Sequence, residues 1–136
     1  MREILFRGKA KGKWFFGDIT EWPLGEFQIW TKTREDGGHN YMIGPATVGQ
    51  FTGLLDKNGK RIFEGDIVIS YLMNTRTKVK FQRYTVDSDN FSASFSLTGI
   101  KDGDFIPRFT ELAAKYLEVI GNIHDNPELL GKEDVE

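Results

Sequence analysis

Two carboxylates in the sequence could carry acid–base chemistry, because Glu64 and Asp66 flank Gly65. General acid–base catalysis needs carboxyl groups with different pKa values in a cleft that faces the substrate. An Asp next to a Gly is also typical of a turn, since its side chain accepts hydrogen bonds from nearby backbone amides. Asp18 follows Gly17 in the same way. The repeated pattern therefore favours two turns over a catalytic pair.

Residues that could bind a metal are equally sparse, with 2 histidines, His39 and His124, and no cysteine. The best set would combine His124 with Asp125 and Glu128. This set lacks the Cys and His spacing of a structural zinc site, and capping of a helical turn explains both acids more simply. The absence of cysteine excludes disulfides and thiolate catalysis. We expect no catalytic residue, no metal and no cofactor, and a protein that is not an enzyme.

Basic residues give the one functional lead. The candidate nucleic-acid-binding cations lie in two glycine turns and on one expected strand, and Trp14 follows the first turn. These candidates are Lys11, Lys13, Trp14, Lys60, Arg61, Arg76, Lys78 and Lys80. If these cations converge beside exposed aromatic rings, they could form a groove for single-stranded nucleic acid, where bases stack on the rings. Outward cations also protect a sheet edge from aggregation. With 18 Lys and Arg against 20 Asp and Glu, the charge balance favours this second role.

The residues from 51 to 68 organise the expected fold. Asn58-Gly59 lies between apolar runs, which is the strongest short-range signal for a hairpin whose turn residues both take positive φ. Gly65-Asp66 marks a second reversal, just before a β-branched run at 67–69. This stretch therefore predicts three consecutive strands joined by tight turns.

Alternation of apolar and polar residues predicts further strands on both sides. In the first part we expect strands over 3–7, 14–20 and 27–31, with Gly8–Lys13 as a basic turn. In the second part we expect strands over 66–71, 76–81, 91–96 and 117–123, with a turn over Asp87–Asn90. A short helix is expected over 109–116. A single helical turn, capped by Asp125 or Asn126, begins with Pro127 near the C-terminus.

Two short segments of similar sequence bear on domain organisation. Gly12–Ile19 resembles Gly59–Ile67 with one inserted residue, Glu64, and each copy has a basic glycine turn followed by Gly-Asp-Ile. The similarity is explained by two related β units, and also by a short hairpin motif that recurs by chance. We expect an N-terminal β unit over 1–46 and a C-terminal β unit over 47–136, packed as one compact globule.

Length and composition fit an all-β fold. The 136 residues include 11 Phe, 4 Tyr and 3 Trp, which supply large apolar side chains for a core between strands. We expect mostly antiparallel, small and strongly curved sheets with barrel-like or SH3-like character. The start of the chain is too charged for a signal peptide, and no apolar run approaches the roughly 20 residues of a membrane helix. We therefore expect a protein that stays in the cytoplasm where it is made.

Several motifs together resemble the YopX family of phage and prophage proteins. They are Thr52-Gly53-Leu54, Glu64–Val68, Glu118–Ile123 and Asn126–Leu130, with a weaker match at Ile4–Arg7. The resemblance spans nearly the whole chain, although Gly8-Lys9 stands where the family commonly has Ala-Trp. It implies a small, mostly β protein that is encoded by a phage or prophage and located in the cytoplasm of a bacterial host cell. The family has no established activity. It supplies no catalytic residues.

The expected role is a non-enzymatic phage accessory protein that binds another macromolecule. We expect a protein partner or self-association, without a membrane or a small-molecule substrate. This role predicts an exposed apolar or aromatic patch and self-association on a sizing column. The alternative is a single-stranded nucleic-acid-binding protein that uses basic turns and exposed aromatic rings. That role predicts a contiguous basic surface and salt-sensitive binding.

Overall fold

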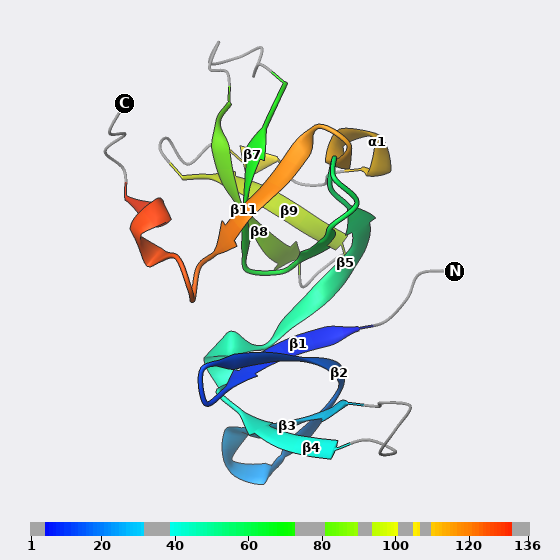
Figure 1. Ribbon diagram of the computed structural model, residues 1–136, viewed down its shortest axis with the longest axis vertical. Helices are drawn as coiled ribbons and strands as arrows, with labels where there is room; N and C mark the ends of the chain where they lie inside the picture. The colour runs from blue at the N-terminus through cyan, green and yellow to red at the C-terminus, as the bar shows by residue number, and fades with distance from the viewer. Residues whose placement is uncertain are drawn as a thin grey trace. The chain divides into compact units, whose positions relative to one another are not determined.

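The computed structural model describes residues 5–31, 39–72, 81–89, 94–100, 105–106 and 110–131. The chain divides into two units, Met1–Phe51 and Thr52–Glu136. Antiparallel strands dominate both units (Figure 1), which confirms the expected all-β class. The expected boundary after residue 46 lies just before the strand that the two units share.

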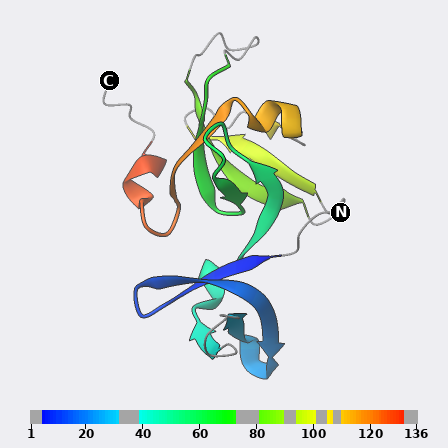
Figure 2. The same cartoon turned by 45° about the vertical axis from the view of Figure 1, so that its right-hand side comes forward.

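Unit 1 is a curled antiparallel sheet. Its elements are β1 (Phe6–Ala10), β2 (Lys13–Trp22), η1 (Pro23–Gly25), β3 (Glu26–Thr31), β4 (His39–Ile43), η2 (Pro45–Thr47) and the start of β5 (Gly49–Leu55). The strand order is β4-β3-β2-β1-β5. Figure 2 shows how β2 bends along its length. The sheet curls so far that Gly44, after β4, donates its N–H to the Lys9 carbonyl of β1 at 3.0 Å.

β2 continues without interruption through Gly17 and Asp18. The strand expected over 14–20 is therefore confirmed, and the turn role suggested for Gly17-Asp18 is wrong. Gly17 pairs with Phe6 inside the sheet. A Cβ atom at Gly17 would lie 1.9 Å from the carbonyl oxygen of Trp30. Glycine is needed here because two backbones approach closely, which is a second use of this residue besides turns. Gly-Asp-Ile thus takes a different conformation in each half of the chain.

The first hairpin turn is shorter than expected. Gly8 and Ala10 belong to β1, so only Lys11 and Gly12 form the turn, with φ of 53° and 78°. Two consecutive residues with positive φ are typical of the type I′ turn, which follows the twist of the flanking strands. Lys11 therefore takes a left-handed conformation that favours Gly or Asn.

Unit 2 contains the rest of β5 and a second antiparallel sheet. Its other elements are β6 (Arg61–Phe63), β7 (Asp66–Ser70), β8 (Arg83–Asp89), β9 (Ser94–Gly99), β10 (Phe105–Ile106), α1 (Glu111–Ala114), β11 (Leu117–Asn122) and η3 (Pro127–Leu130). β6 pairs with β5, and the other strands follow the order β10-β9-β8-β7-β11. For the described residues both strand orders are open, so the curved sheets do not close into a barrel.

The core of unit 2 lies between these strands and α1. Its buried side chains are Ile62, Val68, Tyr84, Val86, Phe95, Leu97, Ala114 and Leu117. They come from β6, β7, β8, β9, α1 and β11, so strands far apart in sequence share one apolar interior. Burial of such side chains is the main stabilising contribution to a domain of this size.

Two elements of unit 2 differ from the sequence prediction. Asp87 continues β8 instead of starting a turn, because its carboxylate accepts a hydrogen bond from Thr98 Oγ1 of β9 at 2.8 Å. The expected helix over 109–116 is a single turn, because Leu117 already pairs with Ser70 as the first residue of β11. The expected strand over 76–81 lies outside the described residues except for Phe81, which precedes β8.

The turn between β5 and β6 is closed by the buried side chain of Asp56. The hairpin is confirmed, but Gly59 takes positive φ, 82°, and Asn58 does not. Asp56 Oδ1 accepts the N–H groups of Asn58 at 2.8 Å and Lys60 at 2.9 Å. Its Oδ2 accepts the N–H of Val119 in β11 at 3.0 Å. With 5% of its surface exposed, this carboxylate joins the hairpin to a strand from the end of the chain.

The first prediction concerns this carboxylate. Asp56→Asn replaces one acceptor oxygen with an NH₂ group, which faces a backbone N–H and leaves it without a partner. We expect the free energy of unfolding to fall by about 2–4 kcal/mol, since buried charge-assisted hydrogen bonds are lost. Urea denaturation measures the change. Asp18→Asn, at an exposed position, is the control and should stay within about 0.5 kcal/mol of wild type; equal losses would contradict the role of Asp56.

The second prediction concerns close approach in unit 1. Gly17→Ala should destabilise the sheet by at least about 2 kcal/mol, because the new methyl group meets a carbonyl oxygen that belongs to the backbone of β3. Gly44→Ala is the control, since its nearest neighbour would be 3.7 Å away and its φ is −65°. Thermal unfolding of both variants distinguishes them. Equal melting temperatures would show that β2 and β3 separate without cost.

Candidate functional site

A pocket of about 600 Å³ borders the first hairpin turn in unit 1. Residues from the turn, from β2 and from β4 line it, including Lys11, Lys13, Phe15, Asn40 and Tyr41. The rings of Phe15 and Tyr41 stack with centroids 4.0 Å apart and an interplanar angle of 20°. They come from β2 and β4, which are separated by β3, so the curl of the sheet brings them together.

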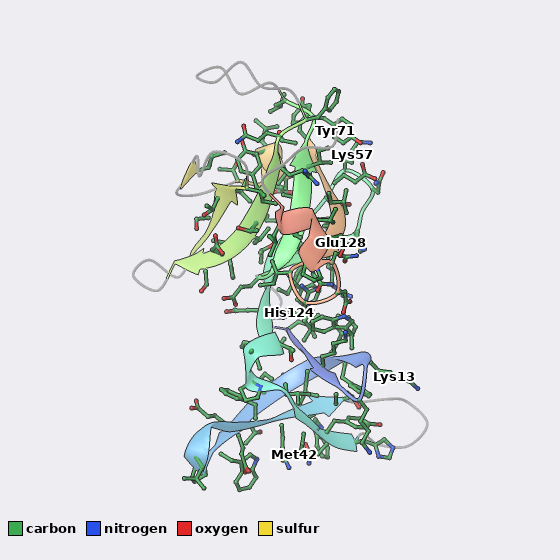
Figure 3. The ribbon with its side chains drawn as sticks, turned by 90° about the vertical axis from the view of Figure 1, so that its left-hand side faces the viewer. Lys13, Met42, Lys57, Tyr71, His124 and Glu128 are labelled. Carbon is green, nitrogen blue, oxygen red and sulfur yellow. The ribbon has the colours of Figure 1, made fainter. Side chains whose placement is uncertain are left out.

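Two of the expected basic residues belong to this pocket. Lys11 and Lys13 are both exposed, and Figure 3 shows Lys13 at the hairpin end of unit 1. Within the described part of the chain, neither ammonium group has a hydrogen-bond or ion-pair partner. An unpaired cation beside an aromatic surface is suited to bind an anionic, planar ligand.

Trp14 is not the exposed aromatic ring beside the basic turn that the sequence suggested. It is half-buried, and the Arg7 guanidinium lies over its ring, 4.7 Å from the centroid. The ammonium of Lys9 lies 5.8 Å from the same centroid. Trp14 therefore packs against cations of its own unit and does not line the pocket. The aromatic surface there is the Phe15–Tyr41 pair, which the sequence analysis missed.

Of the other basic candidates, the described Lys60 and Arg61 do not line this pocket. Lys60 and Arg61 are exposed in the β5–β6 hairpin of unit 2. Arg76, Lys78 and Lys80 lie outside the described residues. The described chain thus brings together Lys11 and Lys13, and separately Lys60 and Arg61.

Of the two carboxylates around Gly65, Asp66 closes the turn between β6 and β7. Gly65 takes positive φ, 92°, and Asp66 Oδ2 accepts the N–H of Phe63 at 2.7 Å. Asp66 is only 2% exposed. An acid that is buried against a backbone amide stabilises a turn, so the structure gives Asp66 the role that the sequence favoured.

His124, Asp125 and Glu128 form no metal-binding group. The Asn122 side chain orders this segment, because its Oδ1 accepts the N–H groups of His124 at 3.0 Å and Asp125 at 2.9 Å. Asn126 provides no side-chain cap for η3; its Oδ1 accepts the Asn122 N–H instead. Figure 3 labels His124 and Glu128. Among the described residues, no three acidic or histidine side chains are placed to hold a metal ion.

Unit 2 carries a second candidate surface, which we call the Tyr71 patch and define as Lys57, Tyr71, Leu72 and Phe81. Tyr71 is 43% exposed and Phe81 is 54% exposed. Their rings meet edge to face with centroids 5.5 Å apart, and the Lys57 ammonium lies 4.7 Å from the Tyr71 centroid. Phe81 takes a left-handed conformation with φ of 57°. A bulky residue in this conformation is strained.

The hydroxyl group of Tyr71 is held by a neighbouring acid. It donates a hydrogen bond to Glu118 Oε1. The pKa of Tyr71 is raised above its ordinary value of 10.0, mainly by this hydrogen bond, then by burial and by the negative charge of Glu118. The hydrogen bond and the charge of Glu118 therefore both favour the neutral form of Tyr71.

The sequence of this chain matches a known protein family over most of its length. The family model described as YopX protein matches residues 7–131. The chain belongs to the YopX family. A crystal structure of protein EF1440 from Enterococcus faecalis is similar to this YopX-family chain, with 23% sequence identity, a TM-score of 0.51, and coverage of 96% of this chain and 100% of that chain. At this identity the similarity shows a shared fold. No curated protein matches the chain.

Membrane insertion through a helix has no structural basis in the described part of this YopX-family chain. No helix there is long and apolar enough to cross a bilayer. The α-helix found among the described residues, α1, is four residues long.

The third prediction concerns the ionisation of Tyr71. Because its pKa is raised in the folded chain, neutral Tyr71 contributes stability that is fully present below pH 10 and is lost as the pH rises through the folded pKa. Glu118→Gln should lower the pKa of Tyr71 toward 10.0, since the charge on the acceptor is removed. Tyrosinate absorbance during a pH titration measures it. Tyr71→Phe should remove the Tyr71 ionisation from the titration curve, whereas Glu111→Gln, at an exposed position, should leave it unchanged. Identical titrations of wild type and Glu118→Gln would show that Glu118 does not raise the pKa of Tyr71.

Proposed function

We propose that this YopX-family chain is a non-enzymatic accessory protein of a phage or prophage, and that it binds a protein through the Tyr71 patch. The observation that supports this function is an exposed Phe81 held in a left-handed backbone against an exposed Tyr71. The left-handed conformation costs about 1–3 kcal/mol for a residue of this kind. Strain of this size at a surface is typical of sites where function, and not stability, sets the local structure.

The patch has the chemistry of a protein-binding hot spot. Tyr and other large aromatic residues are enriched in the centres of interfaces. Tyr71 is fixed by the Phe81 ring, the Lys57 ammonium and the Glu118 carboxylate. A side chain that is already ordered loses little conformational entropy when a partner covers it. The patch therefore fits a protein surface that offers an apolar pocket, on a second copy of this chain or on another protein.

The fourth prediction tests this patch with Phe81→Gly. Glycine removes the ring and also relieves the left-handed strain, so the variant should be as stable as wild type or more stable. We expect it to lose self-association in sedimentation velocity, with the apparent dissociation constant rising at least about tenfold. Leu112→Ser is the control, because Leu112 is 68% exposed and lies outside the patch; it should associate like wild type.

A second measurement tests for a partner protein other than a second copy of this chain. A photo-crosslinking amino acid at Leu72 should form discrete adducts with one protein in the cells that express the chain, and Phe81→Gly should abolish them. The same crosslinker at Leu112 should form none. If wild type and Phe81→Gly associate equally and the Leu72 crosslinker gives no adduct that depends on Phe81, the proposed function is wrong.

A further inference from the structure

We propose that the pocket beside the first hairpin turn binds a nucleotide unit, with its base against the Phe15–Tyr41 pair and its phosphate at Lys11 and Lys13. This inference goes beyond the protein-binding role, because it uses residues of unit 1 and none of the Tyr71 patch. The chemistry is that of a planar ring joined to a phosphate, as in single-stranded nucleic acid or in a free nucleotide.

The aromatic floor of the pocket is already assembled. The Phe15 and Tyr41 rings stack at 4.0 Å, and both rings line the pocket. A base that adds to such a pair extends the stack, and base stacking on aromatic side chains tolerates every base because each base has a flat π-face. The volume of about 600 Å³ lies within the roughly 300–1,000 Å³ that small-ligand sites occupy.

The charge at the rim complements a phosphate. Lys11 and Lys13 are exposed cations that line the pocket, and no described residue neutralises them. Lys13 and Phe15 are two residues apart on β2, so their side chains leave the same face of the strand. A ligand that stacks on Phe15 therefore has a cation one pleat away, which is the pairing that single-stranded nucleic-acid sites use.

The backbone at Lys11 provides an independent observation. Lys11 occupies a left-handed position, with φ of 53°, in a type I′ turn where Asn or Gly is favoured. A residue with a Cβ atom costs roughly 1 kcal/mol there. A lysine that the turn disfavours is explained when its cation has a ligand, since local rules are broken at functional sites. An acidic peptide would use this charge but not the stacked rings, so a nucleotide accounts for more of the site.

The fifth prediction uses the full chain and three fluorescent probes: an oligothymidylate, thymidine monophosphate and an acidic peptide of matched charge. We expect Tyr41→Leu to weaken binding of the nucleotide probes by about 5- to 150-fold, the equivalent of one lost stack, and Tyr41→Phe to restore it. Lys13→Glu should weaken binding and flatten its salt dependence. Lys60→Glu is the matched control, because it makes the same charge change in the glycine turn of unit 2 and should bind like wild type.

Lys11→Asn separates binding from folding. It should raise the melting temperature, because Asn suits the left-handed position, and at the same time weaken binding of the nucleotide probes. A merely structural role for Lys11 would not combine these two effects. Tight binding of the oligothymidylate alone identifies a strand as the source of the ligand, and equal binding of thymidine monophosphate identifies a free nucleotide.

Three results would overturn the inference. They are equal losses for Lys13→Glu and Lys60→Glu, unchanged affinity in Tyr41→Leu, and acidic-peptide binding as tight as that of the nucleotide probes. Phe81→Gly should leave nucleotide binding unchanged. Failure of this inference is therefore distinguishable from failure of the protein-binding role.

Discussion

The buried carboxylate of Asp56 imposes the constraint on which unit 2 depends. A buried charge must be compensated by hydrogen bonds, and Asp56 obtains them from two backbone amides of its own turn and one of β11. The turn therefore cannot move without β11. Lys57, the next residue, donates its N–H to the Leu117 carbonyl, and Tyr71 donates its N–H to the Tyr116 carbonyl. These two backbone bonds end on adjacent carbonyls, those of Tyr116 and Leu117, and so bring Lys57 and Tyr71 together in the patch.

Backbone strain in the described chain falls on exposed residues. The non-glycine residues with positive φ there are Lys11, Leu24 and Phe81, and all three are exposed. Leu24 is 97% exposed and stands between Pro23 and Gly25 at the β2–β3 connection. Burial cannot compensate the strain at such positions, because the side chains contribute little to the core. The stability of each unit comes instead from its buried residues, which leaves the exposed turns open to selection by ligands and partners.

Turn chemistry decided which parts of the fold the sequence could predict. Asn58-Gly59 and Gly65-Asp66 each reverse the chain, because an acid within the same few residues accepts the turn's own amides. Gly17-Asp18 has a similar composition but lies inside a strand. Glycine is needed there because the Trp30 carbonyl of the neighbouring strand leaves no room for a side chain. Local sequence cannot distinguish a glycine used for positive φ from one used for close packing. The expected helix was also shortened by a distant pairing, that of Leu117 with Ser70.

The candidate pocket shows why only half of a site was predictable. Lys11 and Lys13 follow from the basic turn, whereas the Phe15–Tyr41 pair depends on the curl of the sheet across β3. Gly8 permits that curl, because a Cβ atom there would lie 2.2 Å from Ile43 Cδ1. Gly8 pairs with Phe15 on the neighbouring strand, and Ile43 is two residues beyond Tyr41. The absence of one side chain in β1 thus lets β4 approach, and that approach brings Tyr41 onto Phe15.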